Sequence, residues 1–255
     1  MQEIIRVSDV EKYYGNGDQV TKAVDRVSFA VQQGEFIGVM GASGSGKTTL
    51  LNLLSTIDRV TAGHIYYGDT DITELGEEQL SEFRKKQLGF IFQEYNLLDT
   101  LTLEENIMLV MTLHRRGKKE IQKRCRELLR ILGIEEVKDK YPYQVSGGQK
   151  QRCACARALA NHPTLLLADE PTGALDSLSA QTLLETFTDM NQNMGATILM
   201  VTHDAFSASY CSRILFLKDG KIFHELVRGE KERQAFLNEI LDVMTLTGGE
   251  RSHDV

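Results

Sequence analysis

The stretch that decides the fold of this chain reads Gly41-Ala42-Ser43-Gly44-Ser45-Gly46-Lys47-Thr48. It fits the pattern G-x-x-x-x-G-K-[ST], in which glycines let backbone amides curl around an anion and the lysine adds a full positive charge. An apolar run, Phe36–Met40, precedes it, and helix-forming residues 49–54 follow it. A glycine-rich turn with a chance lysine is the alternative, but a strand before the loop and a helix after it favour a phosphate site.

Three further apolar runs predict buried strands, and polar residues follow each of them. Because the carboxyl ends of parallel strands share one edge of a sheet, these residues are expected to converge with the glycine loop. A carboxylate there is suited to the shell of a magnesium ion, and a second one to orienting or deprotonating a water. A histidine at such a strand end can touch the γ-phosphate, although alone it is more often structural. The runs are Leu88–Phe92, 165–168 and 197–201, followed by Gln93, by Asp169 with Glu170, and by Thr202 with His203.

A second helix N-terminus follows much later in the chain, at Ser146-Gly147-Gly148-Gln149. Ser146 and Gln149 form an S-x-x-Q capping box before a predicted helix over residues 151–160. The two glycines bare the backbone, so this helix start is also able to hold phosphate. An ordinary capped helix is the alternative. One triphosphate needs only one such cradle, which indicates that the second serves a second molecule.

Composition excludes several classes of protein. The 255 residues carry 29 Lys and Arg against 36 Asp and Glu, a net charge of −7, which argues against coating nucleic acid or anionic lipid by bulk charge. No apolar run approaches the roughly 20 residues of a membrane span, so the chain is expected to be cytosolic. The four cysteines form no C-x-x-C pair and are interpreted as reduced packing thiols rather than metal ligands or disulfides. A basic cluster is interpreted as a solvated helix face rather than a lipid contact; it comprises Arg115, Arg116, Lys118, Lys119, Lys123 and Arg124.

Strand and helix patterns alternate along the chain, which predicts an α/β fold around a parallel sheet. Short alternating runs near the N-terminus predict an antiparallel layer that flanks this sheet. A helical lobe, a hairpin with an Asp-Gly turn and a C-terminal amphipathic helix complete the pattern. The segments are the flanking strands 4–10, 27–31 and 65–67, the helical lobe 102–132, the turn at Asp219-Gly220 and the helix 230–246.

With these motifs in place, the sequence resembles the ATP-binding subunit of an ABC transporter over nearly all of residues 4–224. Tyr14 is similar to the aromatic residue that stacks on adenine in this family, although Tyr13 adjoins it. The family's motifs match residues 41–48 (phosphate loop), Gln93 (Q-loop), residues 146–149 (signature), residues 165–169 with Glu170 (second nucleotide motif), Ala174-Leu175-Asp176 (D-loop) and His203 (switch histidine).

The resemblance implies a P-loop NTPase ABC cassette with a mixed parallel core sheet, an antiparallel β layer and an inserted α-helical subdomain. The cassette would occupy residues 1–224, with the helical subdomain at about 94–160, and residues 225–255 would form a C-terminal helical extension and tail. The implied ligands are ATP and Mg²⁺. Implied nucleotide-binding residues are Tyr14, Gly41, Ala42, Ser43, Gly44, Ser45, Gly46, Lys47, Thr48, Thr49, Ser146, Gly147, Gly148 and Gln149; implied metal-binding residues are Thr48, Gln93 and Asp169; implied catalytic residues are Glu170, His203, Lys47 and Gln93.

The family also implies partners. Two copies would face head to tail, with each ATP between the phosphate loop of one copy and the signature of the other. A membrane permease would dock against the helical lobe, where Gln93 reports the nucleotide state, and would hold the protein at the cytoplasmic side of the cell membrane. Nucleic acid is not among the implied partners.

Local runs narrow the resemblance to ATPases of bacitracin-type antimicrobial-peptide resistance transporters. The most telling are Tyr95-Asn96-Leu97-Leu98-Asp99 and Asp139-Lys140-Tyr141-Pro142. That family pairs an ATPase dimer with one large permease, often with a sensor kinase. The alternatives are a lipoprotein-releasing or macrolide-type exporter and a regulatory ATP switch. A switch on ribosomes or DNA would need two cassettes or a long coiled coil, and a small-molecule kinase would have no use for the signature.

Overall fold

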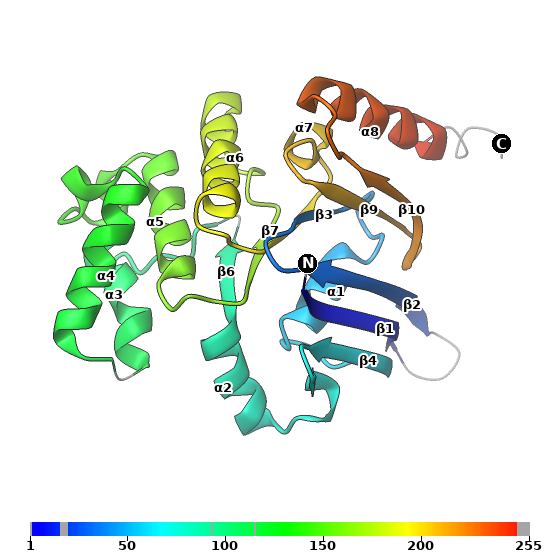
Figure 1. The fold of residues 1–255 in the computed structure, drawn as a ribbon, viewed down its shortest axis with the longest axis horizontal. Coiled ribbons are helices and arrows are strands. Elements are labelled where there is room, and N and C mark those ends of the chain that lie inside the picture. Colours follow the sequence, from blue (N-terminus) through cyan, green and yellow to red (C-terminus); the bar gives the residue numbers. More distant parts are fainter. Residues whose placement is uncertain (1, 16–19, 93, 115, 249–255) are drawn as a thin grey trace.

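The computed structural model describes residues 2–15, 20–92, 94–114 and 116–248, so that Gln93 and Arg115 lie outside the described residues. Its larger sheet has six strands in the order β10-β9-β3-β8-β7-β6 (Figure 1). All pairs are parallel except β9 with β10, and every residue of β3 and β8 is buried, as both faces of this sheet are covered. The apolar runs are therefore confirmed as strands: β3 (Phe36–Met40), β6 (Leu88–Phe92), β7 (Leu165–Asp169) and β8 (Ile198–Thr202), joined by β9 (Arg213–Lys218) and β10 (Lys221–Val227).

The predicted hairpin joins β9 to β10. Asp219 (φ 50°) and Gly220 (φ 78°) both have left-handed backbones, as the tight turn between twisted strands requires. The Gly220 amide donates to the Ser45 carbonyl at 3.0 Å, and its carbonyl accepts from the Asp25 amide at 2.9 Å. The turn thereby ties the phosphate loop to the second sheet.

The smaller sheet is antiparallel, in the order β2-β1-β4-β5, and confirms the predicted flanking layer. Burial alternates along its longest strands, so that one face is apolar. This face, the larger sheet and α1 (Lys47–Leu54) enclose one of two hydrophobic cores. The strands are β1 (Glu3–Tyr14), β2 (Thr21–Gln32), β4 (Ala62–Tyr67) and β5 (Thr70–Asp71).

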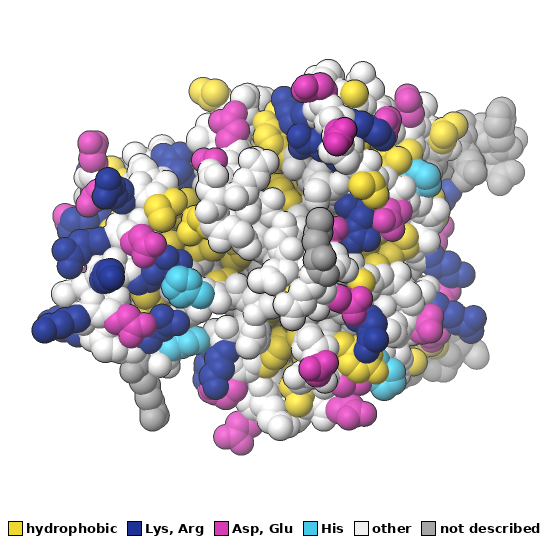
Figure 2. Space-filling model, in the orientation of Figure 1, with side chains coloured by type: hydrophobic (Ala, Val, Ile, Leu, Met, Phe, Trp, Pro, Cys, Tyr) yellow, Lys and Arg dark blue, Asp and Glu magenta, His cyan; other side chains and the backbone are white. Residues whose placement is uncertain are grey.

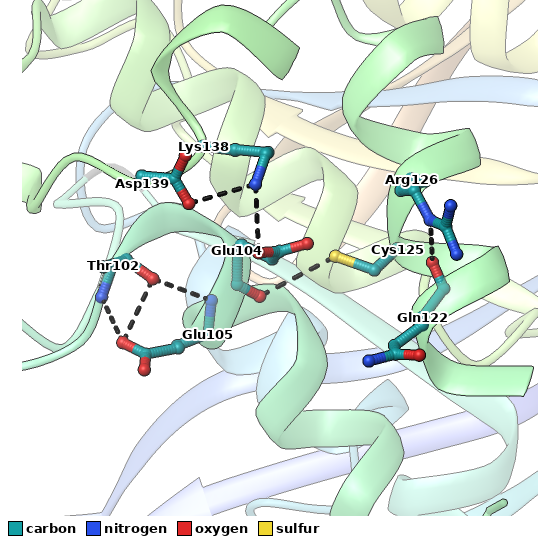
Figure 3. Close-up of polar contacts among 8 residues, drawn as sticks. All are labelled: Thr102, Glu104, Glu105, Gln122, Cys125, Arg126, Lys138 and Asp139. Carbon is teal, nitrogen blue, oxygen red and sulfur yellow. Dashed lines mark hydrogen bonds and ion pairs between the residues drawn. The ribbon is translucent and has the colours of Figure 1, made fainter. Parts of the chain in front are cut away.

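The helical lobe is formed by α3 (Leu103–Leu113), α4 (Lys118–Ile131) and α5 (Gly147–Leu159), inserted between β6 and β7 as predicted (Figure 1). Before it, α2 (Glu77–Gln87) leads into β6. A capping box starts α3, with the Thr102 hydroxyl accepting from the Glu105 amide at 3.2 Å (Figure 3). Next to it, Lys138 bridges Glu104 and Asp139 at 3.5 and 3.0 Å (Figure 3).

Basic side chains gather over the helical lobe in Figure 2. Lys118, Lys119 and Lys123 are exposed there, in keeping with a solvated face. Arg124 does not belong to this face, contrary to the prediction. It is buried, with one guanidinium nitrogen donating to the Leu159 carbonyl at 3.2 Å, because position 124 lies on the side of α4 that packs against α5.

All four cysteines are buried free thiols: Cys125, Cys153, Cys155 and Cys211. Burial raises the pKa of Cys125 and of Cys153 to about 12. The Cys125 thiol lies 3.7 Å from the Glu104 carbonyl (Figure 3). The interpretation as packing thiols is confirmed.

The C-terminal helix α8 (Arg233–Gly248) begins three residues later than predicted and packs against α7 (Ala205–Ala208). Its Phe236 and Ile240 are fully buried in the second core, which also contains α6 (Ser177–Gln192) and the helical lobe. Single-turn 3₁₀ helices occur at Ile72–Glu74, Glu135–Val137 and Pro142–Gln144. Among the described helices, none has both the length and the apolar character that crossing a bilayer requires.

Candidate nucleotide-binding site

The phosphate loop connects β3 to α1, and two of its glycines are required by close contacts. A Cβ at Gly41 would lie 2.3 Å from the Leu217 carbonyl oxygen, and one at Gly46, whose φ is 104°, would lie 2.1 Å from the Ala23 carbonyl oxygen. Neither position therefore accepts a larger residue without moving the backbone. The loop is pressed between the β9 end and β2.

Lys47 folds back over this loop. Its ammonium donates to the carbonyls of Gly41 at 2.9 Å and Ala42 at 3.0 Å, and the residue is only 7% exposed. Among the described residues no carboxylate pairs with it. A buried cation held only by carbonyls is suited to receive an anion at the loop.

The start of α1 offers further donors. The helix begins at Lys47 after Gly46, and no side chain caps it. The first amides of a helix have no partner within it, so those of Lys47, Thr48 and Thr49 are free for an anion and lie at the positive end of the helix dipole. The Ser45 hydroxyl is also buried without a partner. These donors together fit the phosphates of a nucleotide.

Asp169 ends β7 and supplies an acidic oxygen. Its Oδ1 is buried and has no hydrogen-bond partner among the residues that the structure describes. Burial raises the pKa of Asp169, the neighbouring Glu170 raises it further, and Lys47 opposes both. An unpartnered carboxylate oxygen at the edge that carries the phosphate loop fits a magnesium ion, whose preferred ligands are oxygens. Thr48, at the start of α1, can supply a hydroxyl to the same ion.

Glu170 and His203 contact each other directly, a pairing that the sequence did not predict. The His203 Nδ1 lies 2.5 Å from the Glu170 Oε2, because β7 and β8 are adjacent and Asp169 pairs with Val201. Glu170 has a left-handed backbone (φ 46°), and its amide donates to the Val201 carbonyl at 3.0 Å. The histidine side chain is 66% exposed and the carboxylate 22%. The contact with His203 thus fixes the position of the Glu170 carboxylate.

Tyr14, rather than Tyr13, lies beside the start of α1. Its hydroxyl donates to Asp58 at 2.6 Å; burial and Asp58 raise the pKa of Tyr14, and the nearby Thr49 opposes them. The residue is 43% exposed, which leaves its ring accessible for stacking. Tyr13 instead donates to Glu11.

Two residues that the sequence reasoning missed hold this tyrosine. Lys12 pairs with Asp58 at 2.6 Å, and its ammonium lies 4.9 Å from the centre of the Tyr14 ring. The spacing of Lys12 and Tyr14, two residues apart on one strand, was the available signal, since such residues share a face. Asp58 follows α1 and gave no comparable signal.

The second helix N-terminus is built as predicted. The Ser146 hydroxyl accepts from the Gln149 amide at 3.3 Å, and the Gln149 side chain accepts from the Ser146 amide at 3.0 Å, which confirms the capping box. Gly147 and Gly148 occupy the first helical positions of α5. This helix contacts α3, α4, α6 and β6, whereas α1 contacts β2, β7 and β8, so the two helix N-termini are built on separate groups of elements.

A strand, phosphate loop and helix beside an acidic strand end define a P-loop nucleotide-binding protein, and the inserted lobe adds a second capped helix start with two glycines. The ABC transporter family matches residues 24–173. The bacitracin export ATP-binding protein BceA of Halalkalibacterium halodurans is 49% identical over 249 residues, 96% of this chain and 97% of that protein. The ABC transporter ATP-binding protein YxdL of Bacillus subtilis is 47% identical over 98% of this chain and 96% of that protein.

The solved structures agree. The dimeric structure of the cassette MJ0796 of Methanocaldococcus jannaschii superposes with a TM-score of 0.79 at 38% identity, covering 88% of this chain and 98% of that one. The same cassette in a post-hydrolysis state with ADP and Pi gives a TM-score of 0.78. The chain belongs to the ABC transporter family. It is the ATP-binding and ATP-hydrolysing subunit of such a transporter.

Proposed function

We propose that this subunit powers a transporter for resistance to cell-wall-targeting antimicrobial peptides such as bacitracin. The observation that carries the proposal is the end-to-end match to the bacitracin export ATP-binding protein, at 49% identity over 96% of this chain. The lipoprotein-releasing ATPase LolD of Cytophaga hutchinsonii is less similar, at 41% identity over 87% of the chain. A macrolide exporter of Mannheimia succiniciproducens reaches 40%, and this chain covers only 34% of it. Both remain the alternative exporters.

In this proposal residues 1–224 form the cassette, residues at about 94–160 form its helical subdomain, and residues 225–255 form an extension. The phosphate loop and Thr49 hold the ATP phosphates, and Tyr14 stacks on the adenine. The position of Lys47, which is buried and pairs with no carboxylate in the described part of the chain, supports this assignment. Thr48, Gln93 and Asp169 would hold Mg²⁺, which when bound neutralises charge on the phosphate oxygens. The unpartnered Oδ1 of Asp169 supports that set.

For hydrolysis, Glu170 acts as the base that orients and deprotonates the attacking water. His203 and Lys47 face the γ-phosphate, and Gln93 senses it. The contact between His203 and Glu170 supports this division of roles, because a histidine that holds the carboxylate also fixes the direction in which the carboxylate accepts a proton.

Two copies form a head-to-tail homodimer, in which each ATP lies between the phosphate loop of one copy and the signature segment, residues 146–149, of the other. The capped α5 start with its two glycines supports this use, and the dimeric relative supports the stoichiometry. A membrane permease docks on the helical lobe and places the subunit at the cytoplasmic side of the membrane, where a sensor kinase joins the complex.

The test replaces the chain by its Glu170→Gln variant in cells that depend on it. Growth is measured in the presence of bacitracin and of a macrolide, and lipoprotein release is followed with a marker. Only bacitracin tolerance is expected to fall. In parallel, the tagged chain is captured from gently solubilised membranes. One large permease with an extracellular domain supports the proposal, whereas two smaller permease chains, or a macrolide or lipoprotein phenotype, would contradict it.

A further inference from the structure

The segment between β6 and α3 has no regular secondary structure over residues 94–102, yet side chains of the helical lobe hold its backbone. Asn106 of α3, which is 1% exposed, accepts from the Leu98 amide at 2.8 Å. Its amide nitrogen donates to the carbonyls of Leu98 at 3.1 Å, Leu101 at 3.1 Å and Thr102 at 2.9 Å. The second half of the segment, residues 98–102, is therefore fixed to α3.

The preceding half is held by Arg157, from the third turn of α5. One guanidinium nitrogen donates to the Tyr95 carbonyl at 2.8 Å, and the other donates to the Asn96 carbonyl. Among the described carboxylates none pairs with this arginine, so its hydrogen bonds are committed to the loop. A planar guanidinium is suited to bind two adjacent carbonyls at once, which an ammonium is not.

The backbone of this half is bent to meet Arg157. Tyr95 (φ 59°) and Asn96 (φ 49°) are both left-handed, a conformation that a tyrosine rarely adopts unless its surroundings impose it. At the other end, the Tyr95 hydroxyl oxygen lies 3.1 Å from the place where a Cβ on Gly147 would sit. Tyr95 thus touches α5 at two places: its hydroxyl lies at the first residue, and its carbonyl meets the side chain of Arg157, whose backbone lies about 15 Å further along the helix axis.

We propose that Arg157 is a positioning residue that fastens the segment after Gln93 to α5, so that this segment and the signature segment move as one body. The proposal rests on the proposed role of the signature segment in holding the ATP of a second copy. Movement of the segment at Tyr95 is then transmitted through Arg157 and through the Tyr95 ring to the start of α5. Without Arg157 the α5 start must be ordered separately when it meets the phosphate, which weakens ATP-driven dimerisation and leaves the phosphate loop untouched.

The experiment uses the full chain with Glu170→Gln, so that the ATP-bound dimer accumulates, and compares it with the same chain carrying Arg157→Gln. Dimer is measured by light scattering against ATP concentration, and nucleotide affinity of the monomer is measured with a fluorescent ATP analogue at low protein concentration. We expect the ATP needed for half dimerisation to rise about tenfold, with monomer affinity unchanged within about twofold. Arg157→Lys should restore part of the loss. Arg130→Gln, an equal charge change on the exposed face of α4, should have no effect.

The proposal would be overturned if the Arg157→Gln chain dimerised at the same ATP concentration as its parent. It would also be overturned if the monomer lost affinity for the nucleotide to the same extent. A Glu170→Gln parent that fails to dimerise would refute the head-to-tail dimer instead. Hydrogen exchange of the nucleotide-free chain then decides the role of Arg157 separately. In the Arg157→Gln variant, exchange should quicken together at the Tyr95 and Asn96 amides and at Gln149 and Lys150. Arg157→Lys should show the same change in milder form if the glutamine variant does not fold. Faster exchange at Tyr95 and Asn96 alone would overturn the coupling.

Discussion

At the scale of single residues, Glu170 joins two features that local sequence does not reveal. Its backbone is left-handed, and its carboxylate contacts His203, 33 residues further along the chain. The contact follows from the end of β7 lying beside the end of β8. The position of the Glu170 carboxylate is therefore set by the strand order, while its chemistry is set by the residue type.

Glu170→Gln is predicted to leave ATP binding intact and to slow hydrolysis by roughly 10² to 10⁴, the usual contribution of a positioned base. The amide keeps the shape of the side chain and its contact with the histidine but cannot accept the proton of the water. Nucleotide affinity and steady-state phosphate release check the two halves separately. An unchanged turnover would remove Glu170 from the role of base.

Asp169→Asn is predicted to raise the thermal midpoint of the nucleotide-free chain at neutral pH while weakening magnesium-dependent ATP binding. Burial and Glu170 raise the pKa of Asp169 above its unfolded value, so the folded state favours the protonated form. Such a group stabilises the fold fully below the unfolded pKa, about 3.9, and this stabilisation is lost as the pH rises through the folded pKa. The gain from asparagine should therefore be present at pH 7 and absent near pH 4.

Calorimetry at the two pH values measures this difference. Asp242→Asn, at an exposed position of α8, is the matched control and should show no such pH dependence. A midpoint for Asp169→Asn that is unchanged or lower at pH 7 would show that the unpartnered carboxylate does not destabilise the site.

At the scale of elements, α3 and α5 of the helical lobe each begin with a capping box. One starts α3 at Thr102 and Glu105, and the other starts α5 at Ser146 and Gln149. The first is packed within the lobe near Lys138 (Figure 3). The second carries glycines at the next two positions, and only that one is proposed to meet a nucleotide.

Ser146→Ala and Thr102→Ala are each predicted to lower the free energy of unfolding by about 1 kcal/mol, the usual effect of losing an N-cap. Only Ser146→Ala is expected also to weaken ATP-dependent dimerisation in the Glu170→Gln chain. Urea unfolding and light scattering measure the two effects. If the two variants weakened the dimer equally, its loss would reflect stability rather than the signature segment.

At the scale of the whole molecule, α8 is packed as part of the cassette. Phe236 and Ile240 are fully buried. They lie in the same hydrophobic core as residues of β3 and β8, not in a core of their own. Figure 1 shows α8 over the β9 and β10 side of the larger sheet. The extension proposed for residues 225–255 is thus structurally continuous with the cassette over its described part.

Phe236→Ala is predicted to lower the free energy of unfolding by about 3 to 5 kcal/mol, because it removes a fully buried ring from a packed core. Leu241 of the same helix is 45% exposed, and Leu241→Ala should change the free energy of unfolding by less than about 0.5 kcal/mol. Chemical denaturation of both variants gives the comparison. A small effect at Phe236 would mean that α8 is a detachable appendage.

The sequence alone was sufficient for the phosphate loop, the buried strands, the Asp-Gly hairpin and the capping box at Ser146 and Gln149. Each is encoded within a few residues, by glycine and lysine spacing, by apolar runs and by side chains that reach their own backbone. The tertiary structure decided what those local patterns cannot encode: the Glu170 contact with His203, the contact of Tyr14 with Asp58, the burial of Arg124 and the hold of Arg157 on the Tyr95 segment. These depend on which strands and helices become neighbours, and that is set by packing of the whole core, since no periodicity along the chain records the order of strands in a sheet.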